Sequence, residues 1–259
     1  MCRLRFVLPF LLALFAIDDF ASSAEVRPSS ELKSNCFDFP SENFNQLNCI
    51  KCTYGESPTV LLKAGSIAVD FTLHTLEGKP FNLKSALKEK PVVLIWGMYT
   101  CPAYEGLGYA YPFDECSFWD ESGLVSRYHN FFTFVHLVGP EPHPIAPYTN
   151  FDSGTIKVNY WSTIEQPLTY ETKKKVTEKI KEKTHPNSIL LPDYLPDNPY
   201  KPGMSQAVWC TYGMGARTAT VITQDGMIRF TQDWFHASNM AVVLDEILQG
   251  GRSKAEIAL

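Results

Sequence analysis

A short apolar run that leads into a cysteine constrains the fold of this chain more than any other feature. Residues 92–96 read Val-Val-Leu-Ile-Trp, a continuous β-branched and aromatic stretch typical of a strand buried on both faces. Gly97 breaks the pattern, and Cys101 follows directly before Pro102. Proline suits the first position of a helix, so the pattern predicts a thiol at a helix N-terminus, where amides and dipole favour the reactive thiolate. This context favours a reactive cysteine over the alternative, an inert buried one.

Length and charge are those of an ordinary globular protein. The chain has 259 residues, of which 45% are hydrophobic and 20% charged, enough for one domain of about 180–200 residues with additional segments. The formal net charge of −5 argues against a nucleic-acid-binding surface, so we expect no nucleic-acid partner. The basic run at residues 173–175 lies among glutamates, and we interpret it as the solvated face of a helix.

The first 24 residues have the layout of a secretory signal peptide. Arg3 and Arg5 precede a 12-residue apolar stretch at 6–17, and small residues follow at 21–24. The apolar stretch is shorter than the roughly 20 residues that span a bilayer. The sequence therefore predicts a secreted or extracytoplasmic protein from which residues 1–24 are removed. The alternative is an uncleaved N-terminal segment that anchors the protein to a membrane.

Export gives the cysteines a chemical context. Cys2 lies in the signal region, which leaves Cys36, Cys49, Cys52, Cys101, Cys116 and Cys210. An even number in an oxidising compartment suggests disulfides, but the other five cannot all pair if Cys101 stays reduced. Cys49 and Cys52 have a C-x-x-C spacing that we interpret as structural, because no strand leads into it. No second C-x-x-C or close pair of histidines completes a zinc site, so we expect no metal. The pairing itself stays open.

The remainder of the chain divides into an extension, one folded domain and a tail. Residues 25–64 are an N-terminal extension with little periodicity, residues 65–250 form the domain, and residues 251–259 form a C-terminal tail. Within the domain, residues 144–170 form a long irregular insertion. Apolar runs and amphipathic stretches predict strands at 92–96, 132–138, 188–191, 219–223 and 227–230, and helices at about 169–183, 206–215 and 240–248, the last with Gly250 and Gly251 just past its end. A helix between the first two strands makes them a parallel βαβ pair.

Several motifs together resemble one family. Residues 68–83 resemble the N-terminal hairpin of the redoxin branch of the thioredoxin superfamily. The residues around the thiol resemble the iodothyronine deiodinases, which carry Gly-x-x-Thr-selenocysteine-Pro, with cysteine here in place of selenocysteine; they are Gly97, Thr100, Cys101, Pro102 and Tyr104. Glu141 and His143, after the strand at 132–138, match a Glu-x-His turn of the same family. Ligands of open α/β sheets bind at the edge where such strands end.

The resemblance implies a fold and an activity. The fold would be α/β and thioredoxin-like, a central mixed sheet flanked by helices, with an N-terminal extension and an insertion after the third-strand region. The activity would be reductive dehalogenation of an iodinated phenolic substrate, as in the thyroxine deiodinases. Cys101 would be the nucleophile, His143 the proton donor and Thr100 a hydrogen-bonding support, while Glu141 and Arg217 would bind the substrate. No cofactor would be bound, and an external thiol would act as reductant.

Departures from related families keep other functions open. Tyr104 takes the place of the second cysteine of C-x-x-C oxidoreductases, so the site is monothiol. Met98 stands where peroxiredoxins carry threonine, whereas Arg217 falls where they carry an arginine that helps hold the thiolate; the alternative for Arg217 is a surface ion pair. The alternatives are therefore a thiol peroxidase or disulfide reductase, and a secreted binding module without catalysis. The expected partners are a small aromatic or peroxide substrate and a thiol reductant, and assembly as a homodimer stays open.

Overall fold

The computed structural model describes residues 31–32, 62–101, 121–145, 147–149, 156–158, 164–213, 218–233 and 235–256. The predicted signal peptide and most of the extension lie outside these residues. So do Tyr104, Arg217 and every cysteine except Cys101 and Cys210.

A mixed sheet of five strands forms the centre of the domain, in the order β7-β4-β3-β8-β9. The parallel strands are β3 (Val92–Trp96), β4 (Thr133–Val138) and β7 (Ile189–Pro192). The antiparallel strands are β8 (Ala219–Ile222), which pairs with β3, and β9 (Ile228–Gln232), which pairs with β8. All of β3 is buried, as its continuous apolar run predicts.

A small hairpin precedes the central strand, as the redoxin resemblance implies. It consists of β1 (Thr72–His74) and β2 (Pro80–Asn82), which pair antiparallel, and it leads into the short helix α2 (Leu83–Ala86). The side chain of Asn82 caps this helix by accepting the Ser85 amide at 2.8 Å. Asp70 adds a second acceptor for the start of α2, because its carboxylate receives the Lys84 amide at 2.9 Å.

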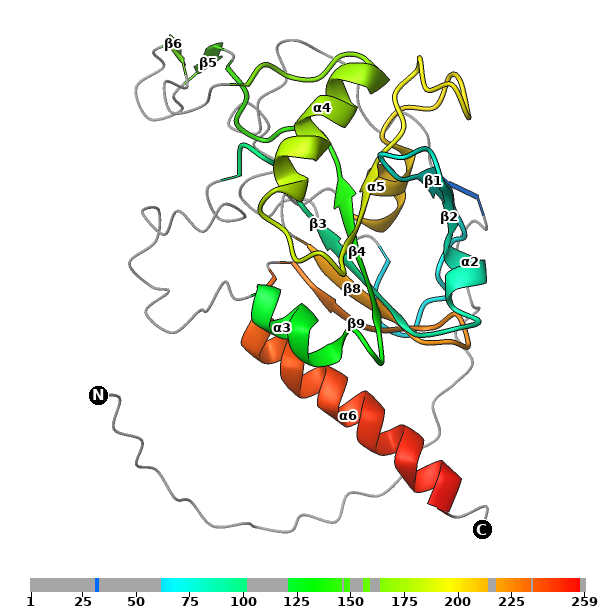
Figure 1. Ribbon diagram of the computed structural model, residues 1–259. Coiled ribbons are helices and arrows are strands. Elements are labelled where there is room, and N and C mark those ends of the chain that lie inside the picture. Colours follow the sequence, from blue (N-terminus) through cyan, green and yellow to red (C-terminus); the bar gives the residue numbers. More distant parts are fainter. Residues whose placement is uncertain are drawn as a thin grey trace, which may run out of the picture.

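Helices and the hairpin cover both faces of the sheet (Figure 1). Helices α3 (Glu121–Tyr128) and α6 (Ala237–Glu256) pack on the face that carries Val93 and Ile95. Helix α5 (Ala207–Tyr212), α2 and the β1–β2 hairpin pack on the other face, against the alternate residues Leu94 and Trp96. Helix α4 (Tyr170–Lys181) packs through Ile180 against Val138 and Leu190. This architecture confirms the predicted thioredoxin-like fold.

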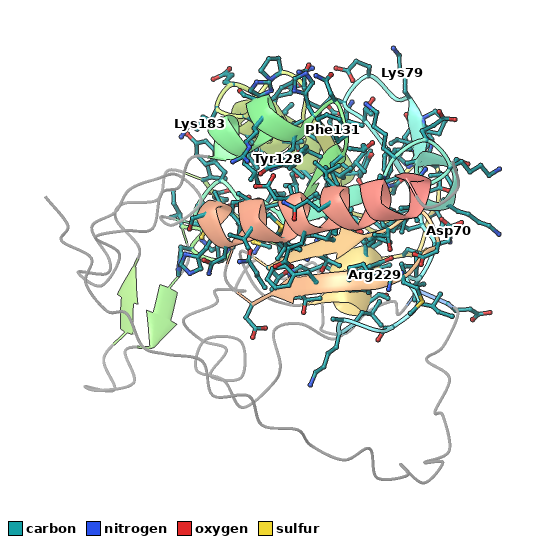
Figure 2. The ribbon with its side chains drawn as sticks, turned by 90° about the horizontal axis from the view of Figure 1, so that it is seen from below. Asp70, Lys79, Tyr128, Phe131, Lys183 and Arg229 are labelled. Atoms are coloured by element: carbon teal, nitrogen blue, oxygen red, sulfur yellow. The ribbon has the colours of Figure 1, made fainter. Side chains whose placement is uncertain are left out.

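The C-terminal helix is held to the rest of the domain by polar contacts as well as by its apolar face. Figure 2 shows α6 crossing the sheet, with Tyr128 of α3 beside it. The Tyr128 hydroxyl donates to Asp245 Oδ1 at 2.8 Å, and Arg127 forms an ion pair with the same carboxylate at 2.8 Å.

No helix in the described part of the chain combines the length and the apolar character needed to cross a membrane.

Three predicted elements need correction. Helix α6 does not end at Leu248, before Gly250 and Gly251, but continues through both glycines to Glu256, because a glycine weakens a helix interior without forbidding it. The insertion at 144–170 is not wholly irregular, since β5 (Pro147–Thr149) and β6 (Ile156–Val158) form a two-stranded sheet within it. The basic run at 173–175 is not entirely solvated, because Lys173 is only 1% exposed.

Candidate active site

The two predicted site segments meet at one edge of the sheet. Strands β3 and β4 are parallel and in register from Val92↔Thr133 to Trp96↔Leu137. The Gly97 amide continues this ladder by donating to the Leu137 carbonyl at 3.0 Å. The segments that follow, 97–101 after β3 and 139–143 after β4, therefore leave the sheet side by side. This is the edge at which open α/β sheets bind their ligands.

Cys101 lies in a turn directly after β3. Its amide donates to the Met98 carbonyl at 3.1 Å, which closes a four-residue turn. The residue is 2% exposed, and its side chain is a thiol outside any disulfide. Cys210 on α5 is disulfide-bonded, so the two described cysteines differ in oxidation state. The helix expected to begin at Pro102 falls in the segment 102–120, outside the described residues.

Glu141 fixes the turn that carries the thiol. Its Oε1 accepts the Tyr99 amide at 3.2 Å and its Oε2 accepts the Thr100 amide at 2.6 Å. The side chain is completely buried, and burial raises the pKa of Glu141, although the hydrogen bonds from Thr100 and Tyr99 act in the opposite direction. The carboxylate is thus occupied by protein amides on the two residues before Cys101. Its predicted contact with substrate stays a prediction, while the structure shows it as a support for the turn.

Thr100 and His143 connect the two segments a second time. The His143 amide donates to Thr100 Oγ1 at 3.0 Å, while the role of Thr100 in supporting the thiol stays a prediction. The His143 ring is largely buried, and its Nδ1 has no hydrogen-bond partner among the residues that the structure describes. Burial lowers the pKa of His143 to about 4. The imidazole is therefore neutral near pH 7.

Gln166 supports the segment after β4 from the far end of the insertion. Its side-chain Oε1 accepts the Glu141 amide at 2.9 Å, and its Nε2 donates to the Glu141 carbonyl at 3.0 Å. A side-chain amide thereby satisfies both backbone groups of the residue whose carboxylate holds the thiol turn. Sequence reasoning missed Gln166, because it follows Glu141 by 25 positions and belongs to no motif.

The backbone around the site packs closely against α5. A Cβ atom at Gly139 would lie 2.8 Å from Met98 Cε and 3.1 Å from Trp209 Cδ1. Met98, which occupies the position of the peroxiredoxin threonine, is 1% exposed and belongs to the core that contains Cys101 and Trp209. A side chain at 139 would thus press on Met98 and Trp209, so close packing between the segment after β4 and its neighbours favours glycine there.

Two lysines of the α4 region lie over the aromatic ring that precedes the thiol. The Nζ atoms of Lys179 and Lys183 lie 5.4 Å and 4.7 Å from the centroid of the Tyr99 ring, within cation–π range. The Tyr99 ring itself packs against Val138 and Ile180. The ammonium groups of Lys179 and Lys183 therefore bring positive charge to the ring of Tyr99, two residues before Cys101, although the net charge of the protein is −5.

The chemistry of the described site is that of a thiol on a fixed turn. A neutral imidazole on the adjoining segment can accept a proton. Among the residues that the structure describes, no group of three or more His, Cys, Asp or Glu side chains is arranged to hold a metal ion. Arg217, the other predicted substrate contact, lies in the segment 214–217, outside the described residues.

Similarity to known proteins is weak and limited to solved structures. No family model and no curated protein matches the sequence. Among solved structures, a pneumococcal exposed lipoprotein thioredoxin from Streptococcus pneumoniae is 17% identical, with a TM-score of 0.41 over 68% of this chain and 98% of that one. The thioredoxin domain of a thiol-disulfide oxidoreductase from Bacteroides vulgatus is 13% identical, with a TM-score of 0.43 over 72% and 98%. A thiol-disulfide oxidoreductase from Bacteroides fragilis is 11% identical, with a TM-score of 0.41 over 70% and 99%. At these values the fold assignment rests on the strand order and directions of this chain itself.

Proposed function

We propose that this protein is a thiol–disulfide oxidoreductase that works through the single thiol of Cys101. The observation that carries the proposal is the placement of a reduced cysteine at the carboxyl end of β3, on a turn whose amides are held by Glu141. A buried carboxylate used to fix a turn, rather than to bind solvent, is the kind of support that a reactive group needs for defined geometry.

The proposed reaction proceeds through a mixed disulfide. The Cys101 thiolate attacks one sulfur of a substrate disulfide, a new S–S bond forms, and the other substrate sulfur leaves as a thiolate that takes up a proton. An external thiolate then attacks the substrate sulfur of the mixed disulfide, and Cys101 departs as a thiolate. The external thiol supplies the electrons, which is required because Tyr104 replaces a resolving cysteine.

His143 is the proposed proton acceptor for the Cys101 thiol. Burial lowers the pKa of His143 to about 4, so the imidazole is neutral near pH 7 and offers a free lone pair to the thiol, although as a weak base. The hydrogen bond from its backbone amide to Thr100 Oγ1 ties it to the residue before the thiol. This role differs from the proton donor that the family resemblance implies.

The test is turnover of a small disulfide by the wild type and by Cys101→Ser. We expect the wild type to reduce the disulfide continuously only when an external thiol such as glutathione is supplied. Without that thiol, one equivalent of leaving thiol per chain is expected. Cys101→Ser should give neither turnover nor the single equivalent, and activity that survives this substitution would exclude the proposal.

Reductive deiodination is the second candidate. It is favoured by the fact that Thr100, Glu141 and His143, the residues named by the deiodinase resemblance, contact one another at the edge of the sheet. In this reaction the thiolate attacks iodine, an S–I bond forms, the C–I bond breaks and the ring carbon takes a proton. An external thiol then reduces the S–I group and releases iodide. Iodide release from an iodinated phenol, lost in Cys101→Ser, would support this candidate, and its absence would remove it.

The low exposure of Cys101 keeps a non-catalytic binding module as a further candidate. A thiol that is 2% exposed and never reacts with small alkylating agents would favour that function. We propose export as the cellular context, on the signal-peptide layout of residues 1–24. The reductant, the thiol peroxidase alternative and assembly as a homodimer stay predictions.

A further inference from the structure

Gln166 lies where the insertion returns to the candidate site. The chain leaves the site segment at Ile145, whose amide donates to the Ile164 carbonyl at 2.7 Å, so the two arms of the insertion meet at its base. Gln166 follows two residues later, before helix α4 begins at Tyr170. It is only 7% exposed, although glutamine side chains are mostly found at protein surfaces. A buried polar side chain at this position needs hydrogen-bond partners inside the protein.

The partners of Gln166 are the two backbone groups of a single residue. Gln166 Oε1 accepts the Glu141 amide at 2.9 Å, and its Nε2 donates to the Glu141 carbonyl at 3.0 Å. Glu141 is 0% exposed, so water does not reach these two backbone groups. A primary amide offers an acceptor and a donor on the same carbon, which a carboxylate or a thioether does not. The amide chemistry of glutamine therefore fixes the backbone at position 141.

The side chain of Glu141 connects this fixed backbone to the thiol turn. Its two oxygens accept the amides of Tyr99 at 3.2 Å and Thr100 at 2.6 Å, the two residues before Cys101. Each step from Gln166 to the turn is thus a direct hydrogen bond. A shift of the Glu141 backbone would move the carboxylate away from the two amides, because only a short side chain joins the carboxylate to that backbone.

We propose that Gln166 is a positioning residue for the Cys101 thiol, because it fixes the Glu141 backbone and thereby keeps the carboxylate within reach of the two amides before the thiol. The base of the insertion is then part of the active site and not an appendage beside it. Attack on a disulfide requires a defined approach of sulfur to sulfur, and misplacement by about 1 Å can lower a rate about 10²-fold. This role rests on the proposed function in treating Cys101 as the reactive group, but the hold of Gln166 on the turn can be measured without any substrate.

Two matched variants separate this role from the loss of any buried glutamine. Gln166→Met keeps a side chain of similar length and removes both hydrogen bonds to Glu141. Gln232→Met is the control. Gln232, at the end of β9, is 8% exposed; it accepts the His236 amide at 3.3 Å and donates to the His236 carbonyl at 3.5 Å. The control therefore removes the same pair of backbone contacts away from the hydrogen bonds that lead to the thiol turn.

The first measurement is hydrogen exchange at the amides of Tyr99 and Thr100 in the full chain, followed by NMR. We expect exchange at both amides to accelerate about 10- to 100-fold in Gln166→Met, the range expected when hydrogen bonds to a charged group are weakened. Gln232→Met should leave both amides as in the wild type and accelerate exchange at His236 instead. Unchanged exchange at Tyr99 and Thr100, or an equal acceleration at the amides of β3, would overturn the proposal.

The second measurement is steady-state turnover of a small disulfide with glutathione, at a temperature where all variants are folded. We expect kcat to fall about 10- to 100-fold in Gln166→Met with KM changed less than about twofold, because the nucleophile is misplaced. Gln232→Met should turn over at the wild-type rate. Wild-type kcat in Gln166→Met would overturn the proposal. If the wild-type protein reduces no disulfide, the proposed function fails, and exchange at Tyr99 and Thr100 still decides whether Gln166 positions the turn.

The route through Glu141 is tested by a double-mutant cycle. In a Glu141→Ala background, adding Gln166→Met should change exchange at Tyr99 and Thr100 by much less than it does alone, and additive effects would contradict the route. If Gln166→Met does not fold, exchange in the wild type decides. The amides of Glu141 and Thr100 should then open together, with equal protection and an equal dependence on low concentrations of urea. A Glu141 amide that opens more readily than the Thr100 amide would overturn the proposal.

Discussion

The Oε2 atom of Glu141 lies 2.6 Å from the amide nitrogen of Thr100, so a carboxylate from the segment after β4 holds the residue immediately before the thiol. The relationship joins two residues 41 positions apart in the chain. It makes the position of Cys101 depend on the pairing of β3 with β4.

Replacing Glu141 should lower stability through the amides that it leaves unsatisfied. Glu141→Ala removes the acceptor of the Tyr99 and Thr100 amides, and a buried unsatisfied donor costs about 1–3 kcal/mol. We expect a loss of about 2–4 kcal/mol in the free energy of unfolding by urea titration, and a smaller loss for Glu141→Gln, which retains one acceptor oxygen. Glu171→Ala, at an exposed glutamate of α4, serves as control. An equal, small effect of both alanine variants would show that the two hydrogen bonds do not stabilise the fold.

The buried imidazole of His143 predicts a loss of stability in acid. Its pKa is lowered to about 4 by burial, so the unfolded chain binds a proton at the ordinary value of 6.5 while the folded chain does not. The contribution to stability is fully present above about pH 6.5 and is lost as the pH falls towards about 4, up to about 3 kcal/mol. Urea titrations over this range should show a flatter pH dependence for His143→Gln than for the wild type. Parallel curves would place the His143 ring in a solvated environment.

Turnover should also depend on His143. Because its lowered pKa makes it a weak base, its contribution as a proton acceptor for the thiol should lie at the lower end of the usual range, about 10² in rate. His143→Ala should therefore reduce turnover of a disulfide by about that factor. His129, whose Nδ1 lies 3.0 Å from the Val125 carbonyl in α3, offers a control substitution away from the site. Wild-type turnover in His143→Ala would leave the cysteine as the only chemical participant.

Replacing glycine by alanine should have opposite effects on stability at positions 139 and 250. Gly139→Ala would place a methyl group 2.8 Å from Met98 Cε and 3.1 Å from Trp209 Cδ1, and such overpacking costs about 1–3 kcal/mol. At Gly250, inside α6, no atom of the described residues lies within 4 Å of the added methyl group. Gly250→Ala should therefore stabilise the protein by about 0.5–1 kcal/mol through helix propensity. Thermal unfolding of both variants checks the prediction, and a neutral Gly139→Ala would contradict the packing argument.

The lysines over Tyr99 predict a preference of the thiol for anionic reagents. Iodoacetate and iodoacetamide carry the same reactive group and differ in charge, so their rate ratio at Cys101 reports the local potential. In the double variant Lys179→Gln/Lys183→Gln the ratio should fall about three- to tenfold at low salt. Lys181→Gln, whose ammonium pairs with Glu77 at 2.6 Å, is the control. A ratio that does not change in the double variant would show that these charges do not reach the thiol.

The sequence predicts those parts of the site that follow from strand order. The apolar run of β3 is unambiguous, and parallel strands end at one edge, so the meeting of the Cys101 turn with Glu141 and His143 could be predicted. The burial of single polar side chains could not be predicted from the sequence. Lys173 stands among lysines and glutamates like any exposed residue, and its burial depends on how α4 packs in the fold, where its ammonium donates to Gln206. Gln166 belongs to no motif, and the neutral state of His143 depends on how closely its neighbours exclude water.

The most direct test of the account is to find where a disulfide reagent reacts in the native, full chain. The protein is mixed with an excess of a small aromatic disulfide, without any external thiol, and the adduct is mapped by mass spectrometry of peptides over time. The account predicts that the first mixed disulfide forms on Cys101 and is absent from Cys101→Ser. First labelling of another cysteine, or no adduct on Cys101 while the fold is intact, would contradict it.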